Sequence, residues 1–459
     1  MQIDYPRILK ALISQGHDYA DVFNERTETT TILKENGKFD KLASRMDNGY
    51  GLRVIRNWKS AYAFSNLLNQ KSLINLAAET AIMLNSENAN TEHKKLTAKN
   101  TNSIHKIDKM PRDISLEEKI RIVNSAENVS KKFHKTVTQV NVTYRDTVRE
   151  TEIANSDGTI VSQKLTYTTL VVFVVASNGD TIQTGFHAEG GMMGLELFRV
   201  FPPEEIALKA AEQAVAMLSA RPAPSGMMQV VLSSEAGGTM IHEAVGHGLE
   251  ADHIHDGTSI YKDKIGKMVA SELITVIDDP TIQNKRGSFD FDDEGVPARK
   301  KVLIEKGILK NYMYDVLTAM KTGTISNGSG RRESYRYRPV PRMSNTLIAP
   351  GDSDPGTIIR SVEHGLFVKK MGGGEVNTLT GDFVFQVIEG YIIEKGALGE
   401  MVRGATIAGN GPEILKTIDM VGRDLGYGIG TCGKDGQGVP VSDAQPTLRI
   451  PEIIVGGYA

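Results

Sequence analysis

The stretch from residue 137 to residue 177 decides the fold of the N-terminal part of the chain. It reads VTQVNVTYRDTVRETEI (Val137–Ile153), then NSDG (Asn155–Gly158), then TIVSQKLTYTTLVVFVVAS (Thr159–Ser177), with NGD following. The two long runs are rich in β-branched residues, and the short segments after them consist of residues typical of turns. We therefore predict an antiparallel meander of long strands.

On either side of this stretch, four segments have the apolar spacing or the end signals of helices. They are DYPRILKALISQ (4–15, ended by Gly16), KSLINLAAETAIMLN (71–85), SLEEKIRIVNSAENVSKKF (115–133) and PPEEIALKAAEQAVAMLSA (202–220). In the third segment, Ser115 followed by Glu118 is the N-terminal capping pattern. The fourth begins with prolines and is rich in alanine, which favours a helix.

Further strands are predicted near the N-terminus. Alternating stretches lie around Asp21–Leu33 and Tyr50–Ser65, and the turn-forming sequences Asn36-Gly37 and Asp47-Asn48-Gly49 separate them. The segment 86–111 is polar and is predicted to be an exposed loop.

The composition changes at RPAPSG (Arg221–Gly226), which has the prolines and glycine of a linker. Beyond it the chain is glycine-rich, with short β-like runs, and we expect only one or two short helices there. The predicted fold class is α+β. Residues 1–225 form a mixed domain of helices and antiparallel strands, and residues 226–459 form an antiparallel β domain.

Composition excludes several classes of protein. The chain has 459 residues, 40% of them hydrophobic and 24% charged, so whole-chain disorder is excluded. Its net charge of -3 gives no electrostatic case for binding nucleic acid or an anionic membrane. No apolar run approaches the ~20 residues of a membrane span, and the N-terminus lacks a secretory pattern. With Cys432 as the single cysteine, no internal disulfide can form, and we expect a cytoplasmic location.

The most informative motif is His242-Glu243-Ala244-Val245-Gly246-His247. Two imidazoles and an adjacent carboxylate are the groups that a hydrolytic zinc site needs: the imidazoles bind the metal, and the carboxylate of Glu243 takes a proton from its water. The histidines stand five apart rather than four, which is about 140° round an α-helix. We therefore predict a distorted helix, either an i→i+5 turn or a helix loosened at Gly246.

A catalytic zinc site normally has three protein ligands and one open position. The candidates for the third ligand are Glu250, Asp252, His253, His255 and a residue far along the chain. Cys432 lies in GIGTCGKDGQG, where the flanking glycines allow close approach of another group. This setting favours Cys432, because a structural cysteine more often sits in an apolar run.

Six segments together carry a resemblance to a known family. They are HEAVGHGLEAD, SFDFDDEGVP, NGSGRRESYRYRPVPRMSNT, GGGEVNTLTGDFVF, IAGNGPEIL and TCGKDGQGVPVSDAQPTLRI. In this order they resemble the motifs of the TldD/PmbA proteins, from Glu235 to the C-terminus, whereas the N-terminal half is similar only in general architecture. The intact H-E-x-x-x-H pattern resembles the TldD side of the family, since PmbA-type members typically lack it.

The resemblance implies a zinc metallopeptidase that acts on short or unfolded peptides. Carried over to this chain, His242, His247 and Cys432 would bind Zn²⁺, and Glu243 would be the general base. The resemblance also implies a dimer that encloses the active sites, either a heterodimer with a PmbA/TldE-type paralogue or a homodimer. The alternative function is a non-catalytic peptide-binding or maturation partner in such a complex. A structural zinc site with four closed ligands is a third possibility.

Three further segments have less specific interpretations. The acidic run 290–294 is typical of a solvated turn, and a cation site is the alternative. The five arginines from Arg331 to Arg342 are interpreted as a loop that grips the peptide backbone or its carboxylate. MGGGEV (Met371–Val376) is predicted to be a loop near the cleft, with an anion-binding nest as the alternative.

Overall fold

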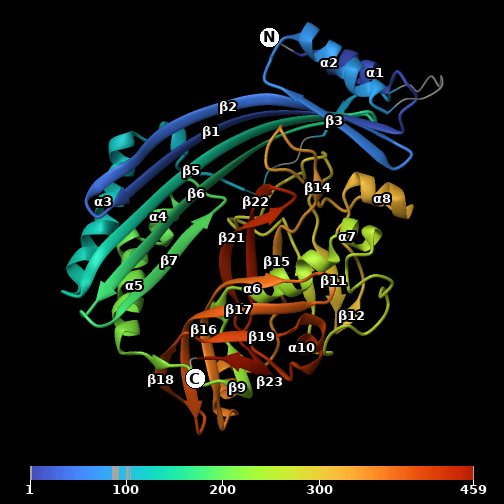
Figure 1. Ribbon diagram of the computed structural model, residues 1–459. Coiled ribbons are helices and arrows are strands. Elements are labelled where there is room, and N and C mark those ends of the chain that lie inside the picture. The colour runs from blue at the N-terminus through green and yellow to red at the C-terminus, as the bar shows by residue number, and fades with distance from the viewer. Residues whose placement is uncertain (1–2, 85–92, 100–102, 104, 458–459) are drawn as a thin grey trace.

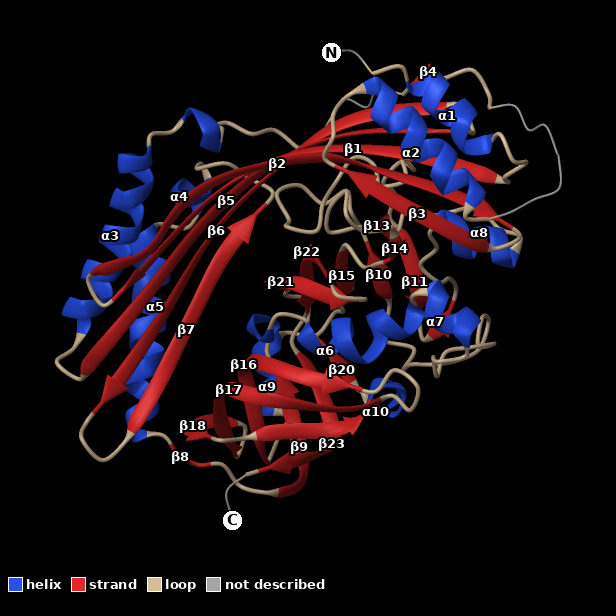
Figure 2. Ribbon diagram, turned by 45° about the horizontal axis from the view of Figure 1, so that its top comes forward, coloured by secondary structure: helices blue, strands red, loops and turns tan. Residues whose placement is uncertain are grey.

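The computed structural model describes residues 3–84, 93–99, 103 and 105–457. A long, curved antiparallel sheet from the N-terminal half arches over the C-terminal half (Figure 1). Figure 2, seen from another direction, shows the strands of the C-terminal half beneath the arch. In the described part of the chain, no helix combines the length and the apolar composition that crossing a membrane requires.

The N-terminal half contains long strands and helices that pack on one side of them. Its elements are α1 (Tyr5–Ile13), β1 (Tyr19–Glu35), β2 (Lys38–Arg56), β3 (Lys59–Ser65), α2 (Gln70–Ile82), β4 (Thr97–Ala98), α3 (Leu116–Phe133), β5 (Val137–Asn155), β6 (Thr159–Ser177), β7 (Ile182–Gly191), α4 (Leu197–Val200), α5 (Pro203–Ala216) and β8 (Arg221–Pro222). Strands β1 to β7 form one sheet in the order β3-β2-β1-β5-β6-β4, and β7 also pairs with β6. The predicted meander and the four predicted helices are confirmed.

The turn predicted at Asp47-Asn48-Gly49 is wrong. Strand β2 runs through it, with Gly49 opposite Glu25 of β1, and the real hairpin turns are at Asn36-Gly37 and Asn57-Trp58. Glycine is needed at position 49 to make room for Tyr335, because a Cβ at this position would lie 2.3 Å from the ring of that residue. Part of the loop predicted at 86–111 lies outside the described residues, and its described part includes β4.

In β1, β2, β5 and β6, residue parity divides the two faces of the arched sheet, since side chains alternate along a strand. Even-numbered residues such as Ile32, Val142 and Val172 are buried in the core with helices α3 and α5. Ala20, Val22 and Leu52, also even-numbered, pack in the core with α1 and α2. The odd-numbered side chains therefore form the other face, which is concave and turned toward the C-terminal half (Figure 1).

The C-terminal half is built from short strands and short helices. Its elements are β9 (Gly226–Leu232), α6 (Thr239–Ile241), α7 (Ala251–Asp256), β10 (Val276–Asp278), β11 (Lys301–Glu305), β12 (Ile308–Leu309), α8 (Val316–Thr322), β13 (Gly330–Arg331), β14 (Val340–Pro341), β15 (Asn345–Ile348), α9 (Pro355–Arg360), β16 (His364–Val376), β17 (Asp382–Glu394), β18 (Ala397–Arg403), β19 (Thr406–Asn410), α10 (Gly411–Thr417), β20 (Met420–Val421), β21 (Gly426–Lys434), β22 (Gln437–Gln445) and β23 (Leu448–Gly456). It has more short helices than the sequence predicts.

Two sheets organise this half. In one, β16, β9, β23, β19 and β17 pair in turn, and β17 pairs back with β16 to close a ring. The other has the order β12-β11-β10-β15-β22-β21, so that β21 is its outermost strand. Most pairings are antiparallel, with parallel ones at β9–β16, β15–β22 and β8–β18. The α+β class is confirmed, while the division of the chain at residues 225 and 226 stays a prediction.

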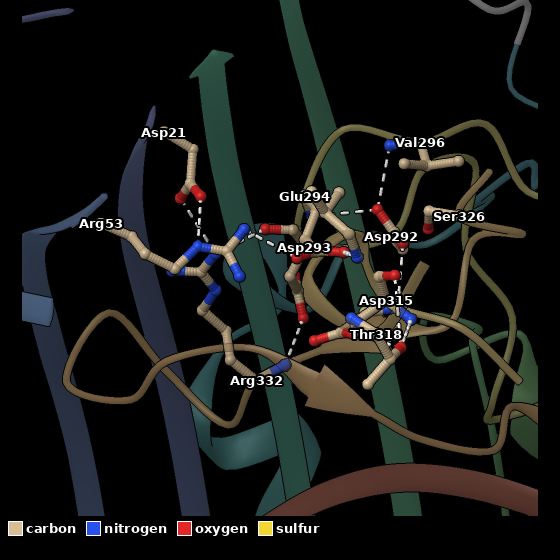
Figure 3. A network of polar contacts seen from close by, with 12 residues as sticks. Asp21, Arg53, Asp292, Asp293, Glu294, Val296, Asp315, Thr318, Ser326 and Arg332 are labelled. Carbon is tan, nitrogen blue, oxygen red and sulfur yellow. Dashed lines mark hydrogen bonds and ion pairs between the residues drawn. The ribbon is translucent and has the colours of Figure 1, made fainter. Parts of the chain in front are cut away.

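A buried set of charges joins the two halves, and we call it the ionic clamp: Asp21, Glu25, Arg53, Arg149, Asp293, Glu294 and Arg332. Arg53 lies 2.6 Å from Asp21 and 2.7 Å from Glu294, and Arg332 lies 3.3 Å from Asp21 (Figure 3). Arg149 lies 2.5 Å from Glu25 and 3.1 Å from Asp293. The ionic clamp thus fastens the concave face of the arched sheet to the C-terminal half.

The clamp corrects the interpretation of the acidic run 290–294. Asp292, Asp293 and Glu294 are at most 4% exposed, so they do not form a solvated turn. Asp292 accepts hydrogen bonds from three backbone N–H groups, and the carboxylates of Asp293 and Glu294 pair with arginines of the arched sheet. All three carboxylates therefore have hydrogen-bonding or ionic partners within the protein.

Candidate functional site

The two histidines lie on a short turn that follows α6. Residues His242–Gly246 form a single π-helical turn, in which the backbone N–H of His247 donates to the carbonyl of His242. This is the predicted i→i+5 turn, and it brings two histidines five positions apart to the same side of the chain. Gly246 allows the packing, because a Cβ there would lie 2.0 Å from the sulfur of Met343.

The side chains of His242, His247 and Cys432 converge. Their ligand atoms all lie within 4.8 Å of one another. Cys432 Sγ is 3.6 Å from Nε2 of His247, although 185 positions separate the two residues. The two imidazole rings stand 5.1 Å apart at 89° to each other, so neither ring blocks the other. Figure 1 shows β21, which carries Cys432, beside the region of α6.

A carboxylate holds each imidazole from behind. His242 Nδ1 is 2.7 Å from Asp443 on β22, and His247 Nδ1 is 3.0 Å from Glu250. These contacts fix the ring orientations and leave both Nε2 atoms free to bind a cation. Burial favours the neutral form of the His247 imidazole, but the carboxylate of Glu250 raises its pKa to about 10.

Cys432 is held in an extended strand rather than in a sharp turn. It lies opposite Val439 of β22, and its carbonyl accepts a hydrogen bond from the buried guanidinium of Arg342. Burial acts to raise the pKa of the Cys432 thiol, but hydrogen bonds from His242 and His247 lower that pKa to about 5. The side chain is therefore a thiolate at neutral pH, the form in which cysteine binds metals.

Glu243 stands at the edge of this cluster. Its carboxylate is 30% exposed and comes no closer than 4.0 Å to Nε2 of His247. Burial raises the pKa of Glu243 above that of a free glutamate, while the nearby histidines lower it in part. A half-buried carboxylate with this position is able to accept a proton from a group bound at the cluster.

The four other candidates for the third ligand have different partners. Glu250 and Asp252 both bind the ammonium group of Lys434, at 3.0 Å and 2.7 Å. The imidazole of His253 contacts Thr258, and that of His255 contacts Thr318 and Thr322. Lys434 thus neutralises the acidic group beside the cluster.

The arginine-rich segment is mostly structural. The structure contradicts the interpretation of Arg331, Arg332 and Arg342 as peptide-gripping residues, because all three are buried and bind protein groups. Arg331 donates to the carbonyls of Met343 and Pro440, Arg332 joins the ionic clamp, and Arg342 holds Cys432.

MGGGEV is not a loop, because it forms the end of strand β16. Sequence reasoning also missed Asp443, which lies 201 positions from its partner His242. No spacing rule connects residues so far apart, and only the fold brings them together.

The donor set fits zinc. Thiolate and imidazole are typical zinc ligands, and ideal tetrahedral bonds place a bound sulfur and nitrogen about 3.6 Å apart. The separation of Cys432 Sγ and His247 Nε2 is the same, 3.6 Å. Within the described part of the chain, this cluster contains three such ligands. Three such ligands with a neighbouring carboxylate are the arrangement of a zinc-dependent hydrolase.

Comparison with known proteins gives the family. Models of the PmbA/TldA metallopeptidase domains match three segments: domain 1 at residues 20–84, the central domain at 109–218 and the C-terminal domain at 225–457. The chain therefore belongs to the PmbA/TldA metallopeptidase family, which is the TldD/PmbA family indicated by its sequence motifs.

Individual relatives agree with this assignment. The chain is 36% identical to the Metalloprotease TldD homolog of Haemophilus influenzae, over 96% of this chain and 93% of that protein. It is 28% identical to the Zinc metalloprotease TldD homolog of Saccharolobus solfataricus, over 98% and 99%. The crystal structure of TldE from Thermococcus kodakarensis has the same fold, with a TM-score of 0.76 at 20% identity, covering 96% of this chain and 97% of that one.

Proposed function

We propose that the chain is a zinc-dependent peptidase that hydrolyses short or unfolded peptides. His242, His247 and Cys432 are the proposed zinc ligands, and Glu243 is the proposed general base. The observation that carries this proposal is the convergence of three ligand atoms within 4.8 Å, with 185 positions between His247 and Cys432. The name of the Saccharolobus relative, a zinc metalloprotease, supports zinc as the metal.

The chemistry follows from the positions of the side chains. Zinc held by His242, His247 and Cys432 would supply a Lewis acid that activates water near neutral pH. Glu243 accepts a proton from the attacking water and later passes it to the leaving amine. Asp443 and Glu250 keep the imidazoles of His242 and His247 in place. Arg342 fixes the backbone of Cys432, so that the thiolate does not have to be ordered when the metal binds.

The position of β21 supports unfolded substrates. It is the outermost strand of its sheet and carries Cys432. An extended peptide that adds to such an edge gains main-chain hydrogen bonds whatever its side chains are. A folded substrate has its main-chain groups already paired and gains nothing there.

We also propose that the chain works as a dimer that encloses the active sites, with a PmbA/TldE-type paralogue or with a second copy of itself. The shared fold of this chain and a TldE protein supports a pseudo-symmetric pair. Light scattering of the chain, alone and mixed with a paralogue, measures the assembly. A chain that stays monomeric and fully active under both conditions contradicts this part of the proposal.

Zinc analysis tests the ligand set. The purified chain is expected to contain about one zinc ion per molecule, and Cys432→Ala is expected to lose it, because two imidazoles alone leave the site incomplete. His255→Ala is the matched control, since its ring contacts Thr318 and Thr322, and it should keep the metal. Full zinc occupancy in Cys432→Ala would exclude this residue as a ligand.

Peptide cleavage tests the base. Glu243→Gln is expected to keep its zinc and to lose about 10²- to 10⁴-fold in kcat, the range for general acid–base groups. Glu235→Gln, an exposed glutamate a few residues earlier, is the control and should cleave at the normal rate. If the wild-type chain binds peptide without any turnover, even with zinc and a paralogue, the non-catalytic role is the better description.

A further inference from the structure

The concave face of the arched sheet lines a cavity that reaches Thr431, the residue before Cys432. The cavity has a volume of about 630 Å³, and its lining comes from β1, β2, β5 and β6 on one side and from β21 and β22 on the other. Figure 1 shows β21 and β22 beneath the arched strands. Its lining contains seven cationic side chains, three carboxylates and seven threonines. A cavity of this size holds a short peptide segment.

Four of the cations that line this cavity have no carboxylate partner among the described residues. They are Lys41 and Arg45 of β2, Arg145 of β5, and Arg286. The other three arginines of the lining pair with carboxylates: Arg149 with Glu25 and Asp293, Arg332 with Asp21, and Arg336 with Asp47. The cavity therefore has a positive potential, although the whole chain has a net charge of -3.

Arg286 connects this cavity to the metal cluster. Its guanidinium donates to the carbonyl of Gly430 and to the hydroxyl of Thr431, the residue before Cys432 on β21. Its Nε is buried and has no hydrogen-bond partner. Burial, with repulsion from Arg145, lowers the pKa of Arg286 to about 10, so the group is still cationic at neutral pH. A buried donor beside unpaired cations is the environment that an anion stabilises.

We propose that this cavity is a carboxylate subsite, in which Arg45, Arg145 and Arg286 bind a carboxylate of the peptide while its main chain lies along β21. The proposal rests on the proposed peptidase function and adds a preference for acidic substrates. Arginine suits this role because its planar guanidinium binds a carboxylate through two parallel hydrogen bonds. The carboxylate comes either from the C-terminus of the peptide or from an aspartate or glutamate side chain.

The position of the subsite relates it to the bond that is cut. Thr431 lines the cavity, and the next residue, Cys432, points into the metal cluster. Neighbouring Cα atoms lie about 3.8 Å apart, and an extended peptide advances by about 3.3 Å per residue. Because side chains alternate along a strand, the cavity and the metal cluster lie on opposite faces of β21, and a peptide along its edge presents neighbouring side chains to the two faces, so the bound carboxylate belongs to a residue near the scissile bond.

Four fluorogenic peptides test the preference. They share one sequence and differ in two places: a free or an amidated C-terminus, and an internal Glu or Gln. With the zinc-loaded full-length chain at low ionic strength, we expect the KM of the best carboxylate peptide to be about five-fold lower than that of the neutral peptide. Loss of the effect on amidation identifies the terminal carboxylate as the ligand, and loss on Glu-to-Gln exchange identifies the side chain.

The double variant Arg45→Gln/Arg145→Gln tests the residues, because both side chains are exposed and make no ion pair with described residues. We expect its ratio of KM values, neutral over carboxylate peptide, to fall toward one. The control Arg7→Gln/Arg121→Gln removes the same charge from exposed helix positions outside the cavity, and it should keep the wild-type ratio. Equal KM values for the four peptides, or equal ratios for the two double variants, would overturn the subsite.

A binding measurement separates this proposal from the peptidase function. The affinity of Glu243→Gln for the four labelled peptides is measured by fluorescence anisotropy, which needs no turnover. Preferential binding of carboxylate peptides by Glu243→Gln, together with no cleavage of any of them by the wild-type chain, would support the subsite and contradict the peptidase. Cleavage of all four peptides with one common KM would do the reverse. Stronger binding of a single-stranded oligonucleotide than of the acidic peptide would assign the cavity to a different ligand and overturn the proposal.

Discussion

The concave face of the arched sheet has two charged regions that differ in what lies opposite. In the ionic clamp, Arg53 and Arg149 meet carboxylates of the C-terminal half; Arg53 is almost completely buried and the side chain of Arg149 is only 12% exposed. Farther along the same strands, Arg45 and Arg145 line the cavity and pair with no carboxylate in the described part of the chain. The residue type, the strand and the face are the same. The partner supplied by the other half of the chain decides whether a charge fastens the fold or stays available to a ligand.

The largest expected effect breaks the clamp. Arg53→Met leaves Glu294 buried without its cation and removes the nearer of the two cations of Asp21, and we expect it to lower the free energy of unfolding by about 3–5 kcal/mol. Urea denaturation measures the loss. Arg45→Met, eight positions away on the same strand and face, should change the stability by less than about 0.5 kcal/mol. Equal losses at both positions would remove the distinction between the two regions.

An intermediate effect is expected at the metal cluster, where carboxylates are also paired but with imidazoles. Asp443→Ala should weaken zinc binding by about 10- to 100-fold, because His242 loses the group that orients it. Asp443→Asn keeps a hydrogen-bond acceptor and should lose less. Competition with a chromophoric chelator measures the affinity, and Asp419→Ala, far from the cluster, is the control. Unchanged zinc affinity in Asp443→Ala would show that the contact does not position the ring.

The smallest effect concerns Asp47, which pairs with Arg336 at the boundary between the two regions. Hydrogen bonding from Arg336 lowers the pKa of the Asp47 carboxyl. A lowered folded-state pKa adds stability above the unfolded pKa of about 3.9, and this stability is lost as the pH falls through the folded value. Since both side chains are nearly half exposed, we expect Asp47→Asn to cost only about 0.5 kcal/mol at pH 7.

The measurement for this pair is urea unfolding of wild type, Asp47→Asn, Arg336→Gln and the double variant. The coupling between the two substitutions should be present at neutral pH and absent once the carboxyl is protonated. A coupling that persists unchanged in acid would mean that charge has no part in the contact.

Local sequence signals predicted much of the fold. The β-branched runs around NSDG gave β5 and β6, and Ser115 caps α3 as expected, since its hydroxyl accepts from the N–H of Glu118. The signal failed at Asp47-Asn48-Gly49, where the need for space beside Tyr335 selects a glycine inside a strand. Turn propensity cannot distinguish these two reasons for a glycine.

The parts of the site that depend on residues close together in the sequence were predictable. The histidine spacing predicted the π-helical turn, and the glycines around Cys432 pointed to close approach of another group. The clamp was not predictable, because Arg53 and Glu294 are 241 positions apart and an acidic run alone resembles a solvated turn. The cavity was missed for the same reason, since its cations are scattered over several strands.

The π-helical turn relates this peptidase to those in which the two histidines stand four positions apart in the sequence. An i→i+5 turn is an α-helical turn with one residue inserted, so removal of Ala244 or Val245 would restore four-residue spacing with both rings still on one side. The two ligand spacings are therefore one deletion apart, and the backbone accommodates the difference within a single turn.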